Sequence, residues 1–231
     1  MNSLVQQEST IIGSEKDILE LEQKENATIL VVSDSHGDAT IITDIIENFG
    51  SQVDALIFCG DGFCDFIEYF EHALDDEKMK ENLPPVLIAV KGNGDSSSYS
   101  LKIDSESETN TLCNYILSNR ITCTIAGRGI FVTHGDHYRV DMGTETLLTA
   151  AHAVDSDMAF FGHTHITHWE EEGGTLVLNP GSCSYPRNSL PPTFATISFP
   201  GEQDRYKVQY YKISKGLFNN HIFEPLAVHM Y

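Results

Sequence analysis

The sequence predicts a single α/β domain that contains two β-sheets. Two observations carry this prediction: apolar strands alternate with helical segments over residues 28–90, and hairpins then follow without an intervening linker. The chain has 231 residues, of which 41% are hydrophobic, so it can bury one sizeable core, although the length alone would also fit two small domains. We expect an acidic N-terminal extension over residues 1–27 and one domain over residues 28–231.

The first half of the chain has the pattern of a parallel sheet with helices on its faces. The N-terminal extension is polar, and Ser14 is a candidate cap for a short helix. Apolar runs rich in β-branched residues then alternate with segments whose apolar residues recur at helical spacing. The expected elements are strands at 28–33, 53–60 and 84–90 and helices at 38–50, which ends at Gly50, and 63–74.

The second half has antiparallel character. Residues 95–111 are polar and rich in serine, so we expect a loop or an insertion there. A pair of strands around a tight turn is expected in 121–135, and a second hairpin in 166–181 around Gly173 and Gly174. The remaining expected elements are a helix at 144–154 and strands at 157–162, 193–199 and 206–213.

Composition excludes several classes of function. The formal net charge is −20, from 34 acidic and 14 basic residues, which disfavours binding to duplex nucleic acid and to anionic membranes. Most of this excess serves solubility, and some carboxylates could bind cations. The chain has no apolar run near the ~20 residues that span a bilayer, and its first residues lack the pattern of a signal peptide. We expect a cytoplasmic protein.

The cysteines give no sign of a disulfide framework. Their number is odd and their spacing is scattered, so we expect reduced thiols and no site built from cysteine alone. They stand at positions 59, 64, 113, 123 and 183.

Polar side chains follow five of the expected strands, at the point where each strand ends. In open α/β sheets the carboxyl ends of strands line the ligand crevice, so these side chains should lie close together. Each short motif alone is weak, because aspartate and asparagine are also ordinary turn residues. Together they favour a metal centre. The residues are Asp34 and His36, then Asp61, then Asn93, then His134, and last His163 and His165.

The stretch AFFGHTHITHW, residues 159–169, is the sharpest of these signals. In an extended segment His163 and His165 would point to the same face and enter one site together. Carboxylates, imidazoles and an amide, without thiolate, suit Mn, Fe, Zn, Co or Ni. Seven donors are too many for one tetrahedral ion and suit two ions about 3.5–4 Å apart.

The ordered motifs DxH, GD, GN, HG and GHxH resemble the calcineurin-like metallophosphoesterases. The stretch NPGSCSYPR, residues 179–187, resembles the small YfcE-type phosphodiesterase branch of that superfamily, which also includes the retromer scaffold subunit. The resemblance covers residues 28 to 213. It implies an α/β fold in which two mixed β-sheets pack as a sandwich with flanking helices.

The resemblance also implies a phosphodiesterase whose site residues hold two divalent ions, Mn²⁺ foremost, with Zn²⁺, Fe²⁺, Ni²⁺ or Co²⁺ as alternatives. A hydroxide that bridges the ions would attack a small phosphodiester. Asp61, Asn93 and His134 would take part in catalysis. The implied ligands are Asp34, His36 and His165 for the first ion, Asn93, His134 and His163 for the second, and Asp61 as the bridge. Asp95 and Asp136 could orient the imidazoles or be ordinary loop residues.

The sequence departs from the wider superfamily at two positions. Gly94 stands where a histidine is thought to protonate the leaving group, and the HGH motif reads His134-Gly135-Asp136. Small diesters or activated esters would therefore be favoured, because a poor leaving group needs a general acid. His137 could supply one, although an exposed histidine is the simpler interpretation. Arg187 could bind a substrate phosphate.

The sequence alone leaves open two other functions and the oligomeric state of the protein. A phosphomonoesterase would use the same ligands, and a non-catalytic scaffold that binds other proteins would use the same fold. All seven donor types are present, which favours the enzyme. Whether the chain forms a homo-oligomer is also open. Ser182, in NPGS, is expected to buttress the site from a turn.

Overall fold

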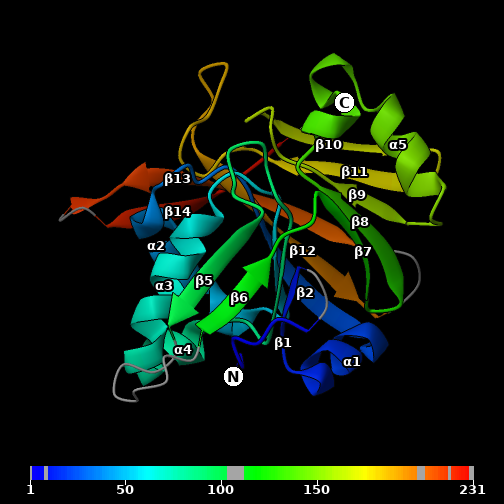
Figure 1. Cartoon of the computed structure of the whole chain (residues 1–231). Coiled ribbons are helices and arrows are strands. Elements are labelled where there is room, and N and C mark those ends of the chain that lie inside the picture. The colour runs from blue at the N-terminus through cyan, green and yellow to red at the C-terminus, as the bar shows by residue number, and fades with distance from the viewer. Residues whose placement is uncertain (1, 8–9, 103–111, 202–205, 218–219, 229–231) are drawn as a thin grey trace.

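Two β-sheets lie face to face, and helices cover their outer faces (Figure 1). The computed structural model describes residues 2–7, 10–102, 112–201, 206–217 and 220–228. The larger sheet has seven strands and the smaller has five. This is the predicted sandwich of two mixed sheets with flanking helices.

The larger sheet combines a parallel centre with antiparallel flanks. Its order is β1-β4-β3-β2-β12-β13-β14, in which β2, β3 and β4 run parallel to one another and the other pairs are antiparallel. The carboxyl ends of β2, β3 and β4 therefore meet at one edge of the sheet. The bounds are β1 Ile11–Gly13, β2 Asn26–Val32, β3 Ala55–Phe58, β4 Val86–Ala89, β12 Thr193–Pro200, β13 Lys207–Lys215 and β14 His221–Leu226.

The smaller sheet has the order β10-β11-β9-β8-β7. β9 runs parallel to both β8 and β11, and hairpins join β7 to β8 and β10 to β11. A separate two-stranded ribbon pairs β5 with β6. The bounds are β5 Ser98–Lys102, β6 Leu112–Ile116, β7 Arg120–Ile125, β8 Arg128–Thr133, β9 Met158–Phe160, β10 Thr167–Glu172 and β11 Thr175–Pro180.

Helices α2, α3 and α4 cover the larger sheet, and α5 covers the smaller one (Figure 1). The Asp38 carboxylate caps α2 by accepting a hydrogen bond from the Ile41 amide, and Ser14 caps α1 in the same way through the Asp17 amide. The bounds are α1 Glu15–Gln23, α2 Ala39–Phe49, α3 Phe63–Asp75, α4 Glu77–Asn82 and α5 Glu145–His152, with 3₁₀ turns at Gly50–Gln52, Asp136–Tyr138 and Val140–Met142.

Three buried apolar layers hold these elements together. Alternate strand residues separate the layers: Leu30 and Val32 of β2 face the helices, whereas Ile29 and Val31 face the other sheet. The third layer lies between the smaller sheet and α5, where Leu147 is fully buried. The central strands, such as β3, β4 and β9, are therefore buried on both faces, which explains why they read as nearly continuous apolar runs.

The N-terminal extension contributes to this architecture. β1 pairs with β4 at the edge of the larger sheet, and α1 lies against β7. Leu4, Ile12 and Leu21 are buried there. The motif-bearing part of the chain therefore begins at residue 28, whereas regular secondary structure already begins at β1.

Two expectations about the strands were incomplete. Part of the segment expected as a loop, residues 95–111, is the strand β5, and residues 103–111 lie outside the described residues. The strands β1, β6 and β14 were not expected at all. All four are ribbon or edge strands, and none has the long apolar run that identifies an interior strand.

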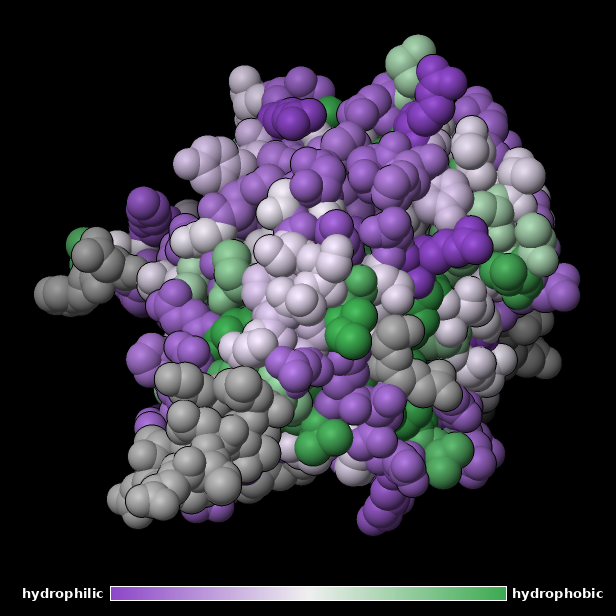
Figure 2. Space-filling model, viewed as in Figure 1, coloured by the Kyte–Doolittle hydropathy of each residue, from purple (hydrophilic) through white to green (hydrophobic). Residues whose placement is uncertain are grey.

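The surface is mainly hydrophilic on the face shown in Figure 2, where hydrophobic residues form small separate patches. This agrees with the formal net charge of −20. Within the described residues, no helix has the length and apolar character needed to cross a membrane.

Candidate metal centre

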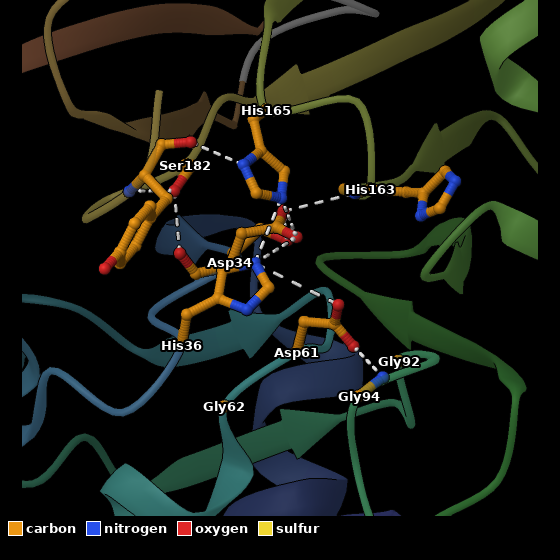
Figure 3. Close-up of polar contacts among 12 residues, drawn as sticks. Asp34, His36, Asp61, Gly62, Gly92, Gly94, His163, His165 and Ser182 are labelled. Atoms are coloured by element: carbon orange, nitrogen blue, oxygen red, sulfur yellow. Dashed lines mark hydrogen bonds and ion pairs between the residues drawn. The ribbon is translucent and has the colours of Figure 1, made fainter. Parts of the chain in front are cut away.

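The loops after β2, β3, β4, β8 and β9 bring the seven predicted ligand residues into one cluster. The first part of the cluster joins the two sheets through Asp34, His36 and His165 (Figure 3). The Nε2 atom of His165 lies 3.0 Å from Nε2 of His36 and 3.2 Å from Oδ1 of Asp34. Ligand atoms of these three residues all lie within 4.8 Å of one another.

The second part of the cluster shares Asp34 with the first. Asp34, Asp61 and His134 offer ligand atoms within 4.8 Å of one another. Oδ2 of Asp61 lies 3.5 Å from Nε2 of His134 and 4.0 Å from Nε2 of His36, so this carboxylate stands between the two parts. Asn93 adds its Oδ1 atom, 3.2 Å from Nε2 of His134.

His163 joins the second part of the cluster through its Nδ1 atom. This nitrogen lies 3.0 Å from Oδ1 of Asn93 and 3.3 Å from Nε2 of His134. The expectation that His163 and His165 share the face of an extended segment was wrong, because both have a left-handed backbone, with φ of 66° and 59°. Figure 3 shows the consequence: the His165 ring points toward His36, and the His163 ring lies apart from it.

Left-handed backbone is a shared property of the ligand-bearing loops. Five of the seven residues adopt it: Asp34, His36 and Asp61 have φ of 57°, 48° and 62°, in addition to His163 and His165. Residues other than glycine rarely adopt this conformation, and it is found where the surrounding structure holds a functional site in place. The cluster is therefore positioned by the loops at some cost in backbone energy.

Two of the rings turn Nε2 toward the cluster. Nδ1 of His134 donates to the Cys59 carbonyl at 2.8 Å, and Nδ1 of His165 donates to the Tyr185 carbonyl. Because Nδ1 keeps its proton, the neutral form of each ring has its lone pair on Nε2, where it can bind a cation. Carbonyl partners of this kind set the tautomer of histidines that bind metals.

The donor set fits divalent cations. Oδ1 of Asp34 is buried and, among the described residues, has no hydrogen-bond partner, although Nε2 of His165 lies 3.2 Å from it. A carboxylate oxygen and an imidazole nitrogen at this distance need a cation or a proton between them, since a buried unpaired oxygen is costly. Carboxylate, imidazole and amide ligands suit Mn, Fe, Co, Ni and Zn.

The electrostatics of the cluster also favour cations. Burial opposes the ionisation of Asp34, but the imidazoles of His165 and His36 outweigh it and hold the pKa of Asp34 well below its usual value. Burial likewise opposes the ionisation of Asp61, but contact with the His134 imidazole lowers the pKa of Asp61 below its usual value. Burial would lower the pKa of His134, but Asp61 and Asp34 raise it to about 9. Both carboxylates therefore stay negative at neutral pH.

Asp95 holds the loops that carry Asp61 and Asn93. Its two carboxylate oxygens accept hydrogen bonds from four backbone amides, at 2.8–3.0 Å. These amides belong to Asp61, Gly62, Phe63 and Gly92. Of the two roles left open by the sequence, Asp95 thus has that of a loop residue, which orients backbone and not an imidazole.

The other polar residues named from the sequence lie around the cluster. Oδ2 of Asp136 lies 3.7 Å from Nε2 of His137, an exposed histidine outside the ligand set. Ser182 buttresses the site, since its hydroxyl donates to the Asp34 carbonyl at 2.7 Å. Arg187 is exposed and lines a pocket of about 460 Å³ together with Asp141.

Asp141 is a site residue that the sequence did not reveal. Its Oδ2 atom accepts a hydrogen bond from Nε2 of His163 at 2.9 Å, which leaves the lone pair of Nδ1 facing Asn93. Asp141 lies in a 3₁₀ turn with no motif around it, so only the fold shows that it reaches His163. A carboxylate behind a histidine raises the basicity of the ligand nitrogen.

Replacement of Asp141 by asparagine should therefore weaken the binding of a cation beside His163 by about tenfold to a hundredfold. Titration of the metal-depleted protein with Mn²⁺ in a calorimeter measures the affinity. Glu145→Gln is the matched control, because Glu145 is an exposed acid four residues further on. Equal affinities for Asp141→Asn and the control would show that Asp141 does not support His163.

The family profile described as a calcineurin-like phosphoesterase superfamily domain matches residues 28–201. The chain belongs to this family. The match spans the motif-bearing loops and confirms the resemblance that the motifs indicated. The calcineurin-like phosphoesterase domain accounts for both sheets apart from β1, β13 and β14.

Two curated proteins are similar to the chain in sequence, and one solved structure shares its fold. The chain is 33% identical to the phosphodiesterase MJ0936 of Methanocaldococcus jannaschii over 66% of its own length and 82% of that protein. It is 28% identical to the probable metallophosphoesterase YsnB of Bacillus subtilis over 79% of its length and 89% of that protein. Vacuolar protein sorting 29 of Cryptosporidium parvum shares the fold at 18% identity, with a TM-score of 0.61 over 88% of this chain and 99% of that one.

Proposed function

We propose that this phosphoesterase hydrolyses a small phosphodiester with the help of two divalent metal ions, Mn²⁺ foremost. The observation that carries the proposal is the pair of donor groups that share Asp34. Within them, carboxylate oxygens and imidazole nitrogens face one another across 3.0–3.5 Å, as ligand atoms around a cation do. Zn²⁺, Fe²⁺, Ni²⁺ and Co²⁺ would accept the same donors.

The ligands divide between two positions. Asp34, His36 and His165 would hold one ion, and Asn93, His134 and His163 the other, since the members of each set lie together. Asp61 would bridge them, because its Oδ2 atom faces a histidine of each set. When bound, divalent ions at such a site lower the pKa of water and offset the charge of phosphoryl oxygens.

The chain's own residues would orient the ester and the ligands. Asn93 carries a side-chain amide at the open end of the second donor set, where it can both bind an ion and hydrogen-bond a phosphoryl oxygen. His134 is held immobile by the Cys59 carbonyl and is fully buried. Side chains whose rotamers are fixed in this way cost no reorganisation when charge develops in the transition state.

A diester is the favoured substrate for two reasons. Gly94 offers no side chain that could protonate a leaving group, and its amide instead donates to Oδ1 of Asp61 at 2.6 Å. A substrate with a good leaving group, or a diester whose single charge is repelled less by the acidic surface, is then hydrolysed more readily. The relative with 33% identity is itself named a phosphodiesterase.

We also propose that the enzyme works in the cytoplasm. All five cysteines are free thiols in the structure, including Cys59 and Cys183 in the core. Burial raises the pKa of both thiols well above the usual value, so they are unreactive at neutral pH. Unpaired thiols are typical of reducing compartments.

The test is hydrolysis of bis-p-nitrophenyl phosphate beside p-nitrophenyl phosphate, after chelation and again after Mn²⁺ is added back. We expect activity to disappear on chelation, to return with Mn²⁺, and to favour the diester. Elemental analysis of the active protein should find two metal ions per chain.

Other results would redirect the proposal. Preference for the monoester would keep the metal centre and change the substrate class. A folded protein that binds two ions but hydrolyses neither ester would favour the non-catalytic scaffold.

A further inference from the structure

The loop after β11 fixes one aromatic residue at the metal centre by its backbone alone. The Tyr185 amide donates to the Ser182 hydroxyl at 2.7 Å, and the Tyr185 carbonyl accepts the Nδ1 proton of His165. Ser182 is in turn bonded to the Asp34 carbonyl. The position of Tyr185 is therefore set by the same contacts that support two ligands, and its side chain takes no part in them.

The ring of Tyr185 stands beside the cluster and faces solvent. Tyr185 is 65% exposed, although its ring centroid lies 5.9 Å from that of His36 in an edge-on arrangement. Burying a tyrosine ring would be favourable, so an exposed one on a fixed backbone is available for contact with a ligand. A substrate whose phosphorus lies at His36 would have its organic group within reach of this ring.

Charge and shape restrict the chemical class of the substrate group that would contact Tyr185. An aromatic face suits a flat π-system, and stacking of a base on an aromatic side chain tolerates any base. The net charge of −20 disfavours a long polynucleotide. Arg187 follows two residues later, with its amide on the His165 carbonyl at 3.3 Å and its side chain exposed, and it adds a cation for a single phosphate.

We propose that Tyr185 is the specificity-determining residue of the site and that it stacks on a nucleobase, which makes the substrate a small nucleotide diester. The inference rests on the proposed phosphodiesterase function and adds the class of its substrate. Stacking on the base is the same in the ground state and in the transition state, so it acts on KM and not on kcat.

The experiment compares thymidine 5′-(p-nitrophenyl phosphate) with ethyl p-nitrophenyl phosphate. The two diesters lose the same leaving group, so their ratio of kcat/KM reports only the nucleoside. We expect the wild type to prefer the thymidine ester by about tenfold or more, and Tyr185→Ala to remove most of this preference through a higher KM. Tyr185→Phe should retain it.

Controls separate this inference from the proposed function. Leu19→Ala, a truncation of a 55% exposed side chain on α1, should keep the wild-type ratio. If the wild type hydrolyses both esters and Tyr185→Ala keeps the same ratio, the inference is overturned and the phosphodiesterase stands. If neither ester is hydrolysed, the proposed phosphodiesterase function is wrong. The inference is then tested by calorimetric binding of thymidine 5′-monophosphate to the wild type and to Tyr185→Ala. Equal affinities would overturn the inference.

Discussion

Replacement of Asp61 by asparagine should lower kcat/KM for bis-p-nitrophenyl phosphate about a thousandfold and remove most of the bound metal. Asp61 is 4% exposed, and its Oδ2 atom is the one that faces histidines of both donor sets. The substitution keeps the shape of the side chain and removes the charge that two cations would share. Loss of metal chemistry of this kind is worth several kcal/mol. Steady-state kinetics and elemental analysis measure the two effects.

Asp155→Asn is the matched control for this substitution. Asp155 has the same left-handed backbone, with φ of 52°, and lies exposed before β9. Asparagine tolerates this conformation, so neither variant should strain the chain. Full activity and two ions per chain in Asp61→Asn would refute the ligand assignment.

Asp95→Ala should lower the free energy of unfolding by about 4 kcal/mol and reduce activity together with it. The change would leave four backbone amides without their acceptor, and Asp95 is only 8% exposed. The melting temperature should fall by about 10 °C, as expected for a chain of this size. Urea unfolding followed by circular dichroism gives the free energy.

Asp76→Ala provides the comparison for Asp95→Ala. Asp76 also accepts two backbone amides, those of Lys78 and Met79 at 2.9 and 3.2 Å, but it caps the exposed helix α4. Its replacement should cost about 1 kcal/mol and leave activity unchanged. If Asp95→Ala proved no more destabilising than Asp76→Ala, the amide contacts of Asp95 would not hold the site.

Residue patterning was sufficient to predict the centre of the fold and the place of the site. Strands such as β2 and β3 are buried on both faces, so their apolar runs are nearly unbroken and easily recognised. Parallel strands bring their carboxyl ends to one edge, and this rule alone predicts that Asp34, Asp61 and Asn93 lie together. The rule needs only the order of the elements along the chain.

Features that depend on tertiary contact could not be predicted in this way. β14 has an alternating, largely exposed pattern and exists because β13 offers it an open edge. The conformation of His163 and His165 depends on the Asn179 side chain, which bonds the Gly162 carbonyl at 2.7 Å and the Thr164 hydroxyl at 3.0 Å. The role of Asp141 depends on a 3₁₀ turn that packs against another loop. None of these contacts has a local sequence pattern.

The division of the ligands between two sheets determines when in folding the site can exist. His36 and His165 are 129 positions apart, and β2 must also pair with β12, where Val31 lies opposite Ala195. Closing loops of this length has an entropic cost, and this cost is offset only after the distant contacts form. A chain emerging from the ribosome could assemble neither donor set in full until β9 and the loop after it are available. Metal uptake should therefore be among the last events of maturation, and it would serve as a natural marker that the chain has reached its native state.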